Sequence, residues 1–383
     1  MMKIIPFLYL NRWSSQRYYD INKIWMGYNK TMKIYRVGII GIGNIGKFHI
    51  EALRKLDHIE VVSICSKSDM EQRAKALNVK TYYTDYEEMI LNESLDVVHI
   101  CTTNDQHYPM AAFAIKHGVH VVLEKPMTLT HEEAEHLNEL AENYQVVNEV
   151  HFHNRFYPIN SLVKDTLKEV GDIVSISGSY LQDWMIPRDQ FNWRAQSKAS
   201  GLTRVIADVG THWFDLIEYV TGHKISEVSA KFKQIYEERS HITIDTEDVG
   251  VIIFKTDHGA IGTCLISQSV AGKKNEVSYL ISGTKASIIN EGTSIHEATI
   301  GYQQQENIKI KRHHIDTLKT GQLFEVNSFV DSFTECFRQV YYKIKHSGFK
   351  YDYADFKVGL HSMKLVDAIY LSNKEERWVK VNG

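Results

Sequence analysis

The 383-residue chain predicts two domains: a doubly wound α/β domain, then an α+β domain with an open, mainly antiparallel sheet. In the first part, continuous apolar runs alternate with amphipathic stretches, which is typical of parallel strands covered by helices on both faces. Beyond His151, longer segments alternate apolar and polar residues, which is typical of antiparallel strands. With 43% hydrophobic residues, the chain can bury ample core.

The elements follow from these two patterns. In the first domain we expect strands at 35–40, 59–64, 97–101, 119–123 and 146–150, separated by helices at 45–56, 70–77, 109–116 and 131–144. In the second domain we expect strands at 173–180, 225–232, 249–254, 260–267 and 277–282, then helices at 324–345 and 354–372. We place the domains at 32–152 and 153–383.

Composition excludes several classes of protein. The 44 Lys and Arg nearly balance the 47 Asp and Glu, so neither a nucleic-acid-binding surface nor an acidic tail is expected. No apolar stretch approaches the roughly 20 residues that a membrane-spanning helix needs. The four cysteines lack the spacing of a metal site or a disulfide framework, so we expect a cytoplasmic protein with reduced thiols.

Residues 1–31 form an extension before the first predicted strand. Their apolar stretch is interrupted by Pro6 and no small-residue cleavage site follows it, which disfavours a secretory signal. Met32 stands directly before the regular pattern, as it would if translation began there. We expect this extension to be poorly ordered or loosely docked.

The clearest motif is Gly41-Ile42-Gly43-Asn44-Ile45-Gly46, between the first predicted strand and its helix. In this context the first glycine permits a tight turn, the second lets the backbone approach a pyrophosphate, and the third lets the helix pack close to the sheet. The helix N-terminus then faces the phosphates. The motif predicts a Rossmann dinucleotide-binding domain, with cofactor contacts from Gly41, Gly43, Asn44, Ile45 and Gly46.

The end of the second strand bears on which dinucleotide binds. An acidic residue there would bind the ribose 2′-hydroxyl and repel a 2′-phosphate, whereas Ser66 followed by Lys67 accommodates the phosphate. We therefore expect NADP in preference to NAD. Asp69 lies only slightly later and keeps NAD as the alternative.

Three segments carry a resemblance to a known family: Cys101-Thr102-Thr103-Asn104-Asp105-Gln106-His107, then Glu124-Lys125-Pro126, then Asp208-Val209-Gly210-Thr211-His212. From Met32 to its end, the chain resembles the Gfo/Idh/MocA family, the glucose–fructose oxidoreductase and inositol dehydrogenase group. The resemblance implies a Rossmann domain, an open antiparallel sheet domain, NAD or NADP, and redox chemistry on sugars, cyclitols or related polyols. It also implies that the cofactor is lined by Thr102, Asn104, His107, Glu124 and Lys125.

Lys125 is the first candidate catalytic residue. It follows the fifth predicted strand, at the sheet edge where open α/β folds bind ligands. Its ammonium can hydrogen-bond a substrate oxygen and stabilise the alkoxide character that grows as hydride leaves. A solvated surface lysine is the alternative, and the Glu and Pro neighbours, which resemble the family motif, favour catalysis.

Asp208 and His212 are the other catalytic candidates. Four residues apart, they share a face if they open a helix. A histidine suits proton exchange with a hydroxyl near neutral pH. Asp208 would support that exchange or bind an adjacent hydroxyl, and it can also cap the helix.

Further residues are candidates for substrate contact or metal binding. By resemblance, the section where the family varies its substrate contacts contains Arg155, Trp184, Trp193 and Arg194. For either tryptophan a core position fits equally well. Glu149, His151 and His153 alternate along one strand face, but the cysteine ligands of a zinc dehydrogenase are missing, so no metal is expected.

One segment departs from the family pattern. Ser200-Gly201-Leu202-Thr203-Arg204 stands where family members commonly place a small residue or a glycine pair. Arg204 either shapes the pocket for a particular substrate or faces solvent, so no relative's substrate is transferred.

The sequence thus predicts an NAD(P)-dependent oxidoreductase of a sugar, cyclitol or related polyol. Pairing through the open sheet face would give a homodimer or homotetramer. Two alternatives are a redox-cycling glycosidase of the same fold, which retains its cofactor, and a non-enzymatic dinucleotide sensor.

Overall fold

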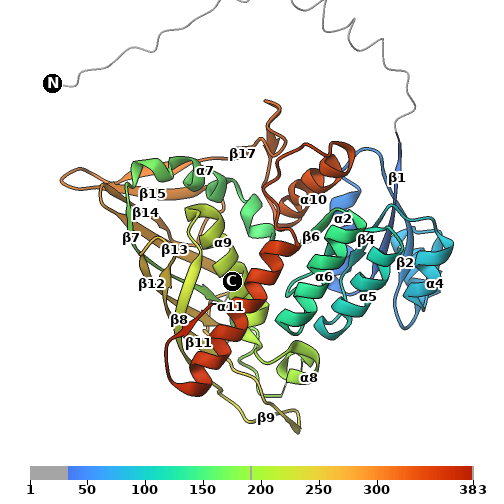
Figure 1. Ribbon diagram of the computed structural model, residues 1–383, viewed down its shortest axis with the longest axis horizontal. Coiled ribbons are helices and arrows are strands. Elements are labelled where there is room, and N and C mark those ends of the chain that lie inside the picture. The colour runs from blue at the N-terminus through green and yellow to red at the C-terminus, as the bar shows by residue number, and fades with distance from the viewer. Residues whose placement is uncertain (1–32, 190–191, 382–383) are drawn as a thin grey trace, which may run out of the picture. The chain divides into compact units, whose positions relative to one another are not determined.

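Two large sheets organise the chain from Tyr35 onward (Figure 1). The computed structural model describes residues 33–189 and 192–381, so the extension expected at 1–31 lies outside the described residues. Among the described helices, none has both the length and the apolarity needed to cross a bilayer.

The first sheet is parallel throughout, with strand order β3-β2-β1-β4-β5-β6. Its strands are β1 (Tyr35–Ile40), β2 (Ile59–Cys65), β3 (Thr81–Tyr83), β4 (Val97–Ile100), β5 (His120–Leu123) and β6 (Asn148–Val150). This order confirms the predicted Rossmann domain, whose sheet reverses its direction of growth between β1 and β4. The short β3 was not expected, because three residues are too few to show a pattern.

Helices cover both faces of this sheet: α2 (Asn44–Leu53), α3 (Met70–Leu77), α4 (Tyr86–Asn92), α5 (Asn104–Lys116) and α6 (His131–Tyr144). One core cluster joins α2 and α3 to one face, and a second joins α4, α5 and α6 to the other. Side-chain caps start two of these helices, Asp85 at α4 and Thr130 at α6. The helix expected at 109–116 begins earlier, because Pro109 is accommodated inside α5.

The second sheet has the order β16-β15-β14-β13-β7-β12-β11-β8-β19 and is antiparallel except for the β7–β12 pair. Its strands are β7 (Ile173–Leu181), β8 (Ile225–Lys233), β11 (Val249–Thr256), β12 (Ile261–Ser267), β13 (Glu276–Gly283), β14 (Ala286–Asn290), β15 (Glu297–Tyr302), β16 (Ile308–Lys311) and β19 (Val379–Lys380). The expected open, mainly antiparallel sheet is therefore confirmed. Two ribbons accompany it: β9 (Glu238–Arg239) with β10 (Ile242–Thr243), and β17 (His314–Ile315) with β18 (Phe324–Glu325).

Within residues 33–189 and 192–381, helices pack on one face of the second sheet. The core there includes residues of α7 (Pro158–Thr166), α9 (Thr211–Thr221) and α11 (Phe356–Glu375), and alternate strand residues such as Ile252 and Phe254 point into it. In Figure 1, α9 and α11 lie between this sheet and the Rossmann helices. The expected helix 354–372 corresponds to α11.

The helix α10 (Phe329–Lys345) returns to the first sheet. Its Phe333 and Phe337 join the core cluster that contains Val37 and Ile39 of β1. The helix expected at 324–345 starts later than predicted, because Phe324 pairs with Ile315 in a β ribbon. Distant parts of the sequence therefore build one face of the Rossmann layer.

Candidate active site

The glycine motif forms the turn from β1 into α2. Gly41 has φ +92°, and a Cβ there would lie 2.5 Å from the Cys101 carbonyl oxygen. A Cβ at Gly46 would lie 2.1 Å from the carbonyl oxygen of Gly41. Only glycine fits either position, so the turn and the close helix–sheet contact have the predicted cause.

The N-terminus of α2 is free to receive an anion. Gly43 is its N-cap, makes no side-chain cap and is exposed, and no acidic residue lies in the first turn. A Cβ on Gly43 would meet no atom within 4 Å, so open space faces the backbone here. The N–H groups at Asn44 and Ile45, with the positive end of the helix dipole, suit a diphosphate. The loop therefore fits the predicted dinucleotide.

The end of β2 lies beside this loop, because the Gly41 N–H donates to the Cys65 carbonyl at 2.8 Å. Ser66 is half-buried and Lys67 is exposed, directly after that strand. Arg73 of α3 donates from Nη1 to the Ile42 carbonyl oxygen at 2.9 Å and so joins α3 to the glycine turn. Sequence reasoning missed Arg73, since a lone arginine on an amphipathic helix carries no motif.

The candidate cofactor-binding residues that follow β4 make hydrogen bonds to the backbone of neighbouring segments. His107 is buried, and its Nδ1 lies 2.8 Å from the Pro126 carbonyl oxygen and its Nε2 3.3 Å from that of Thr102. Burial lowers the pKa of His107, so the neutral ring can donate over only one of these contacts. Asn104 donates to the Ser200 carbonyl at 3.1 Å. These residues fix the positions of Thr102 and of the segment that contains Lys125.

Glu124 is buried and contacts His49 and the Lys125 backbone. Its Oε1 lies 3.1 Å from Nε2 of His49, and its Oε2 accepts the Lys125 backbone N–H at 3.2 Å. Burial opposes ionisation of Glu124, but the His49 hydrogen bond and the nearby His151 outweigh it and lower the pKa to about 2. Burial lowers the pKa of His49 to about 4, so a neutral imidazole donates to a carboxylate.

Lys125 and Asp208 meet in a partly buried ion pair. The Lys125 Nζ donates to Asp208 Oδ1 at 2.8 Å and to the Asp208 carbonyl oxygen at 2.7 Å. The second carboxylate oxygen, Oδ2, accepts from Nε2 of Gln268 at 2.6 Å, and Arg194 Nε lies 3.4 Å from Oδ1. Burial raises the pKa of Asp208, but Lys125 and Arg194 outweigh burial and hold it well below its usual range. Two distant sequence motifs are thereby joined into one site.

His212 completes the predicted cluster. Asp208 lies in a π-helical turn (Ile206–Gly210) that leads directly into α9, and His212 follows in the first turn of α9. His212 is buried, its Nδ1 has no hydrogen-bond partner among the described residues, and its ring lies 5.1 Å from that of His153. Burial, then the neighbouring Lys125, lowers the pKa of His212 to about 3. The imidazole is therefore neutral near pH 7, with one ring nitrogen as a hydrogen-bond acceptor, and its pKa lies below the near-neutral range expected from the sequence.

The substrate candidates divide into two groups. The Trp193 ring lies 4.4 Å from the guanidinium carbon of Arg194, which faces Asp208, and Trp184 donates from Nε1 to Gln182 at 2.7 Å. Arg155 is instead held in the core, where Nε donates to Asp215 at 2.8 Å. The structure thus places Arg194 on Asp208 and Trp193 on Arg194, whereas Trp184 contacts Gln182 and Arg155 pairs with the buried Asp215.

Two further groups of the site were not predicted. Gln268 follows β12 and contacts Asp208 from 60 residues away in the chain, a pairing for which the sequence carries no signal. Of the two alternatives for Arg204, a pocket residue or a solvent-facing one, its burial excludes the second, and its contact with Gln268 was not predicted.

Two sets of side chains within residues 33–189 and 192–381 bring metal-ligating atoms within 4.8 Å of one another: His49, Glu124 and His151, and Glu149, His151 and Cys336. In the first set a hydrogen bond joins His49 to Glu124 only, and the buried Nε2 of His151 has no hydrogen-bond partner among the described residues; in the second set both other members contact Glu149. His151 Nδ1 and Cys336 Sγ both lie on Oε1 of Glu149, at 3.1 and 3.2 Å. His153, which alternates with Glu149 and His151 in the sequence, contacts Ser332 and belongs to neither set.

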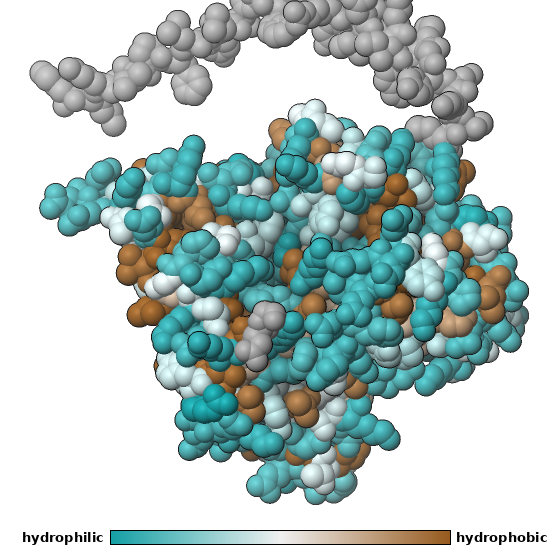
Figure 2. Space-filling model, viewed as in Figure 1, coloured by the Kyte–Doolittle hydropathy of each residue, from teal (hydrophilic) through white to brown (hydrophobic). Residues whose placement is uncertain are grey.

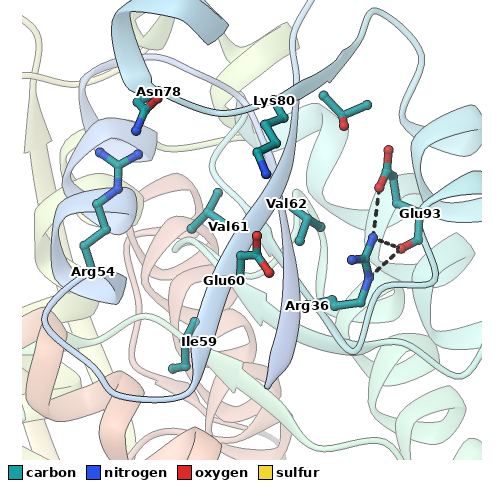
Figure 3. Close-up of a pocket in the computed structure, with 10 residues that line it drawn as sticks. Arg36, Arg54, Ile59, Glu60, Val61, Val62, Asn78, Lys80 and Glu93 are labelled. Atoms are coloured by element: carbon teal, nitrogen blue, oxygen red, sulfur yellow. Dashed lines mark hydrogen bonds and ion pairs between the residues drawn. The ribbon is translucent and has the colours of Figure 1, made fainter. Parts of the chain in front are cut away.

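A hollow of about 470 Å³ lies elsewhere on the Rossmann domain, at the amino ends of β1 and β2. Figure 3 shows Arg36 joined to Glu93 across it, with Glu60 and Lys80 nearby. Open α/β sheets bind ligands at the carboxyl ends of their strands, so this hollow lies at the opposite edge from the glycine turn.

Comparison with known proteins agrees with this geometry. Residues 35–152 match the oxidoreductase family with an NAD-binding Rossmann fold, GFO_IDH_MocA, and residues 163–289 match the GFO/IDH/MocA C-terminal domain. Levoglucosan dehydrogenase of Pseudarthrobacter phenanthrenivorans is 27% identical over 67% of this chain and 74% of its own length. The NADP(+)-dependent scyllo-inositol 2-dehydrogenase of Bacillus subtilis is 27% identical over 67% of this chain and 66% of its own length.

A solved structure shows the same fold. Levoglucosan dehydrogenase in complex with NADH and levoglucosan superposes with a TM-score of 0.83 at 22% identity, covering 91% of this chain and all of that one. Both domain matches, the confirmed fold and the glycine turn lead to one conclusion: the chain belongs to the Gfo/Idh/MocA family of NAD-binding oxidoreductases.

Proposed function

We propose that the protein transfers hydride between a nicotinamide dinucleotide and a hydroxyl-bearing carbon of a sugar, cyclitol or related polyol. The observation that carries this proposal is the Lys125–Asp208 ion pair, which lies at the carboxyl edge of the sheet and beside the neutral His212. The relatives named for levoglucosan and scyllo-inositol support this substrate class.

Each polar group has a chemical task in the oxidation of an alcohol. When bound, the nicotinamide supplies the hydride acceptor, or the hydride donor in the reverse direction. Lys125 donates a hydrogen bond to the reacting oxygen and stabilises its negative charge as the C–H bond breaks. His212 accepts the hydroxyl proton, so that alcohol and oxidised cofactor become carbonyl, reduced cofactor and a proton. Asp208 holds the ammonium in place, and Arg194 and the two tryptophans contact the sugar.

The preferred cofactor is NADP. Ser66 and the exposed Lys67 leave space and a positive charge where the 2′-phosphate would lie. Arg73, bound to the glycine turn, adds a second cation beside this segment. NAD stays the alternative, since Asp69 follows closely.

We also propose that a second copy of the chain covers the outer face of the second sheet, the face opposite α7, α9 and α11. Exposed apolar side chains lie there on two adjacent strands: Val251 and Ile253 on β11, and Ile261 and Leu265 on β12. Val251 and Leu265 are direct cross-strand partners. Figure 2 shows hydrophobic residues gathered at the left edge, where Figure 1 places β7 and β12. Burying such a face favours a homodimer or homotetramer.

The remaining assignments complete the proposal. Residues 32–152 bind the cofactor and residues 153–383 bind substrate and form the oligomer. Arg155 has a structural role, and no metal is required, so a chelator leaves turnover unchanged. The four free thiols fit a reducing, cytoplasmic location.

Absorbance of the reduced nicotinamide tests the function. The protein is mixed with NAD or NADP and a panel of inositols, pyranoses and glycosides. Growth of the reduced band with one substrate and one cofactor supports the proposal and settles the cofactor. Tight cofactor binding with no net reduction, but with cleavage of a glycoside, would favour the redox-cycling glycosidase; binding with no chemistry would favour the sensor.

A further inference from the structure

The two oxygens of the Asp208 carboxylate accept hydrogen bonds from two different groups, an ammonium and an amide. Its Oδ1 faces the Lys125 ammonium, and its Oδ2 accepts a hydrogen bond from Gln268 at 2.6 Å. Gln268 is fully buried. The neutral Gln268 amide thus donates to the Asp208 carboxylate oxygen that Lys125 does not contact.

The orientation of this amide is determined by its neighbours. Arg204 Nη1 donates to Gln268 Oε1 at 3.0 Å, so the carbonyl end must face the guanidinium. On the other side, Nε2 donates to Asp208 and to Gln182 Oε1 at 3.1 Å, both of which are acceptors. A flipped amide would oppose donor to donor and acceptor to acceptor, and lose these bonds.

Arg204 is itself held firmly. Its backbone N–H donates to both carboxylate oxygens of Glu247 at 3.0 Å, and its Nη2 donates to the Glu247 carbonyl oxygen at 2.7 Å and to the Asp248 carboxylate. Asp248 also pairs with Arg239 at 3.0 Å, and all three charged side chains are fully or almost fully buried. Removing one member of such a buried network is costly, so the guanidinium is a fixed anchor.

We propose that Gln268, oriented by Arg204, is a positioning residue that sets the rotation of the Asp208 carboxylate and thereby the place of the Lys125 ammonium. The inference rests on the proposed hydride transfer at this site. The Gln268 amide links the Asp208 carboxylate to the fixed Arg204 side chain and adds no charge next to the carboxylate. Asp208 Oδ2 is therefore held by a neutral donor, while the two cations near the carboxylate, Lys125 and Arg194, both lie on Oδ1.

Gln268→Glu is the sharpest test, because a protonated carboxyl group has nearly the shape and bonding pattern of the amide. When protonated, Glu at 268 can donate to Asp208 Oδ2 and accept from Arg204. When ionised, it opposes Asp208 with like charge. The charged groups around this position are Arg204 and Asp208 in contact, and Lys125, Arg194, Glu247 and Asp248 one contact further.

The measured quantity is the ratio of kcat in the variant to kcat in the native enzyme across pH. At alkaline pH we expect kcat of the variant to be about 10²-fold lower than that of the native enzyme, because a small displacement of the Lys125 ammonium reduces turnover. As the pH falls, the ratio should rise toward one. A ratio that is independent of pH would overturn the proposal. The exposed Gln322→Glu, which adds the same charge elsewhere, serves as the matched control.

A neutral variant guards against misfolding of Gln268→Glu. Gln268→Met keeps the volume but removes the three side-chain hydrogen bonds of Gln268, and we expect kcat to fall about 10²-fold at every pH while the Kd of the cofactor is unchanged. Unchanged kcat would refute the positioning role. If the native protein shows no hydride transfer, the proposed function fails by itself. A crystal structure of Gln268→Met then decides the inference: a carboxylate still bound to Lys125 in the native geometry would overturn it.

Discussion

Replacing Lys125 by Met removes one charge at the centre of the site and keeps most of the side-chain volume. Lys125 supplies two hydrogen bonds to Asp208 and, in the proposed mechanism, one to the reacting oxygen. Loss of a single donor to a developing alkoxide costs about 10²–10³-fold in kcat, or about 3–4 kcal/mol. We therefore expect kcat to fall by at least that factor.

The same variant makes three further measurable changes. The pKa of His212 rises from about 3, because Lys125 lowers it next after burial. Folding stability falls by about 1–3 kcal/mol, because the Asp208 carboxylate and the Asp208 backbone carbonyl each lose one donor, while the carboxylate keeps Gln268 and Arg194. Cofactor affinity is retained, because the glycine turn is intact.

Three assays measure these effects: stopped-flow reduction of the nicotinamide for kcat, NMR titration for His212, and fluorescence quenching for the cofactor Kd. The exposed Lys274→Met is the control. Turnover within threefold of the native value, with cofactor binding intact, would refute the catalytic role of Lys125.

Four other outcomes are expected. Gly43→Ala should weaken cofactor binding without lowering Tm, because its Cβ enters open space. Gly46→Ala should lower both cofactor affinity and Tm, because its Cβ lies 2.1 Å from the Gly41 carbonyl oxygen. Cofactor titration and thermal melting measure these effects, and equal Tm losses in the two variants would contradict the difference. Ser66→Asp should shift the ratio of kcat/KM values from NADP toward NAD, and an unchanged ratio would place the 2′ site elsewhere. Ile261→Glu should reduce the mass measured by light scattering to that of a monomer, and an unchanged mass would remove this face as the interface. Stability to urea should fall as the pH drops from about 6.5 toward 4. In this range His49 is protonated in the unfolded chain but stays neutral in the folded protein, because burial lowers its pKa to about 4. Stability that does not change with pH over this range would contradict the buried neutral ring.

Much of the fold was predictable because local pattern decides it. Continuous apolar runs identified β1, β2, β4 and β5, and alternating runs identified the central strands of the second sheet. The three-residue β3 was missed because it is too short to show a period. No local pattern reveals that α10 packs against β1, because that placement depends on tertiary contacts such as those of Phe333.

The candidate site divides in the same way. Lys125, Asp208 and His212 belong to motifs, and the structure brings the first two into direct contact. Gln268 and Arg73 belong to no motif, and their roles arise from pairings between distant segments. Arg155 looked like a substrate contact because arginine often binds hydroxyls or a carboxylate, but burial against Asp215 is visible only in three dimensions.

The transfer of deuterium from substrate to cofactor tests the central claim most directly. A polyol deuterated at the reacting carbon is incubated with the protein and oxidised cofactor, and the products are analysed by mass spectrometry. The account predicts one deuterium in the released reduced nicotinamide, a carbonyl product, and loss of this transfer in Lys125→Met. Deuterium that stays in the sugar, or label lost to water with no reduced cofactor released, would contradict it.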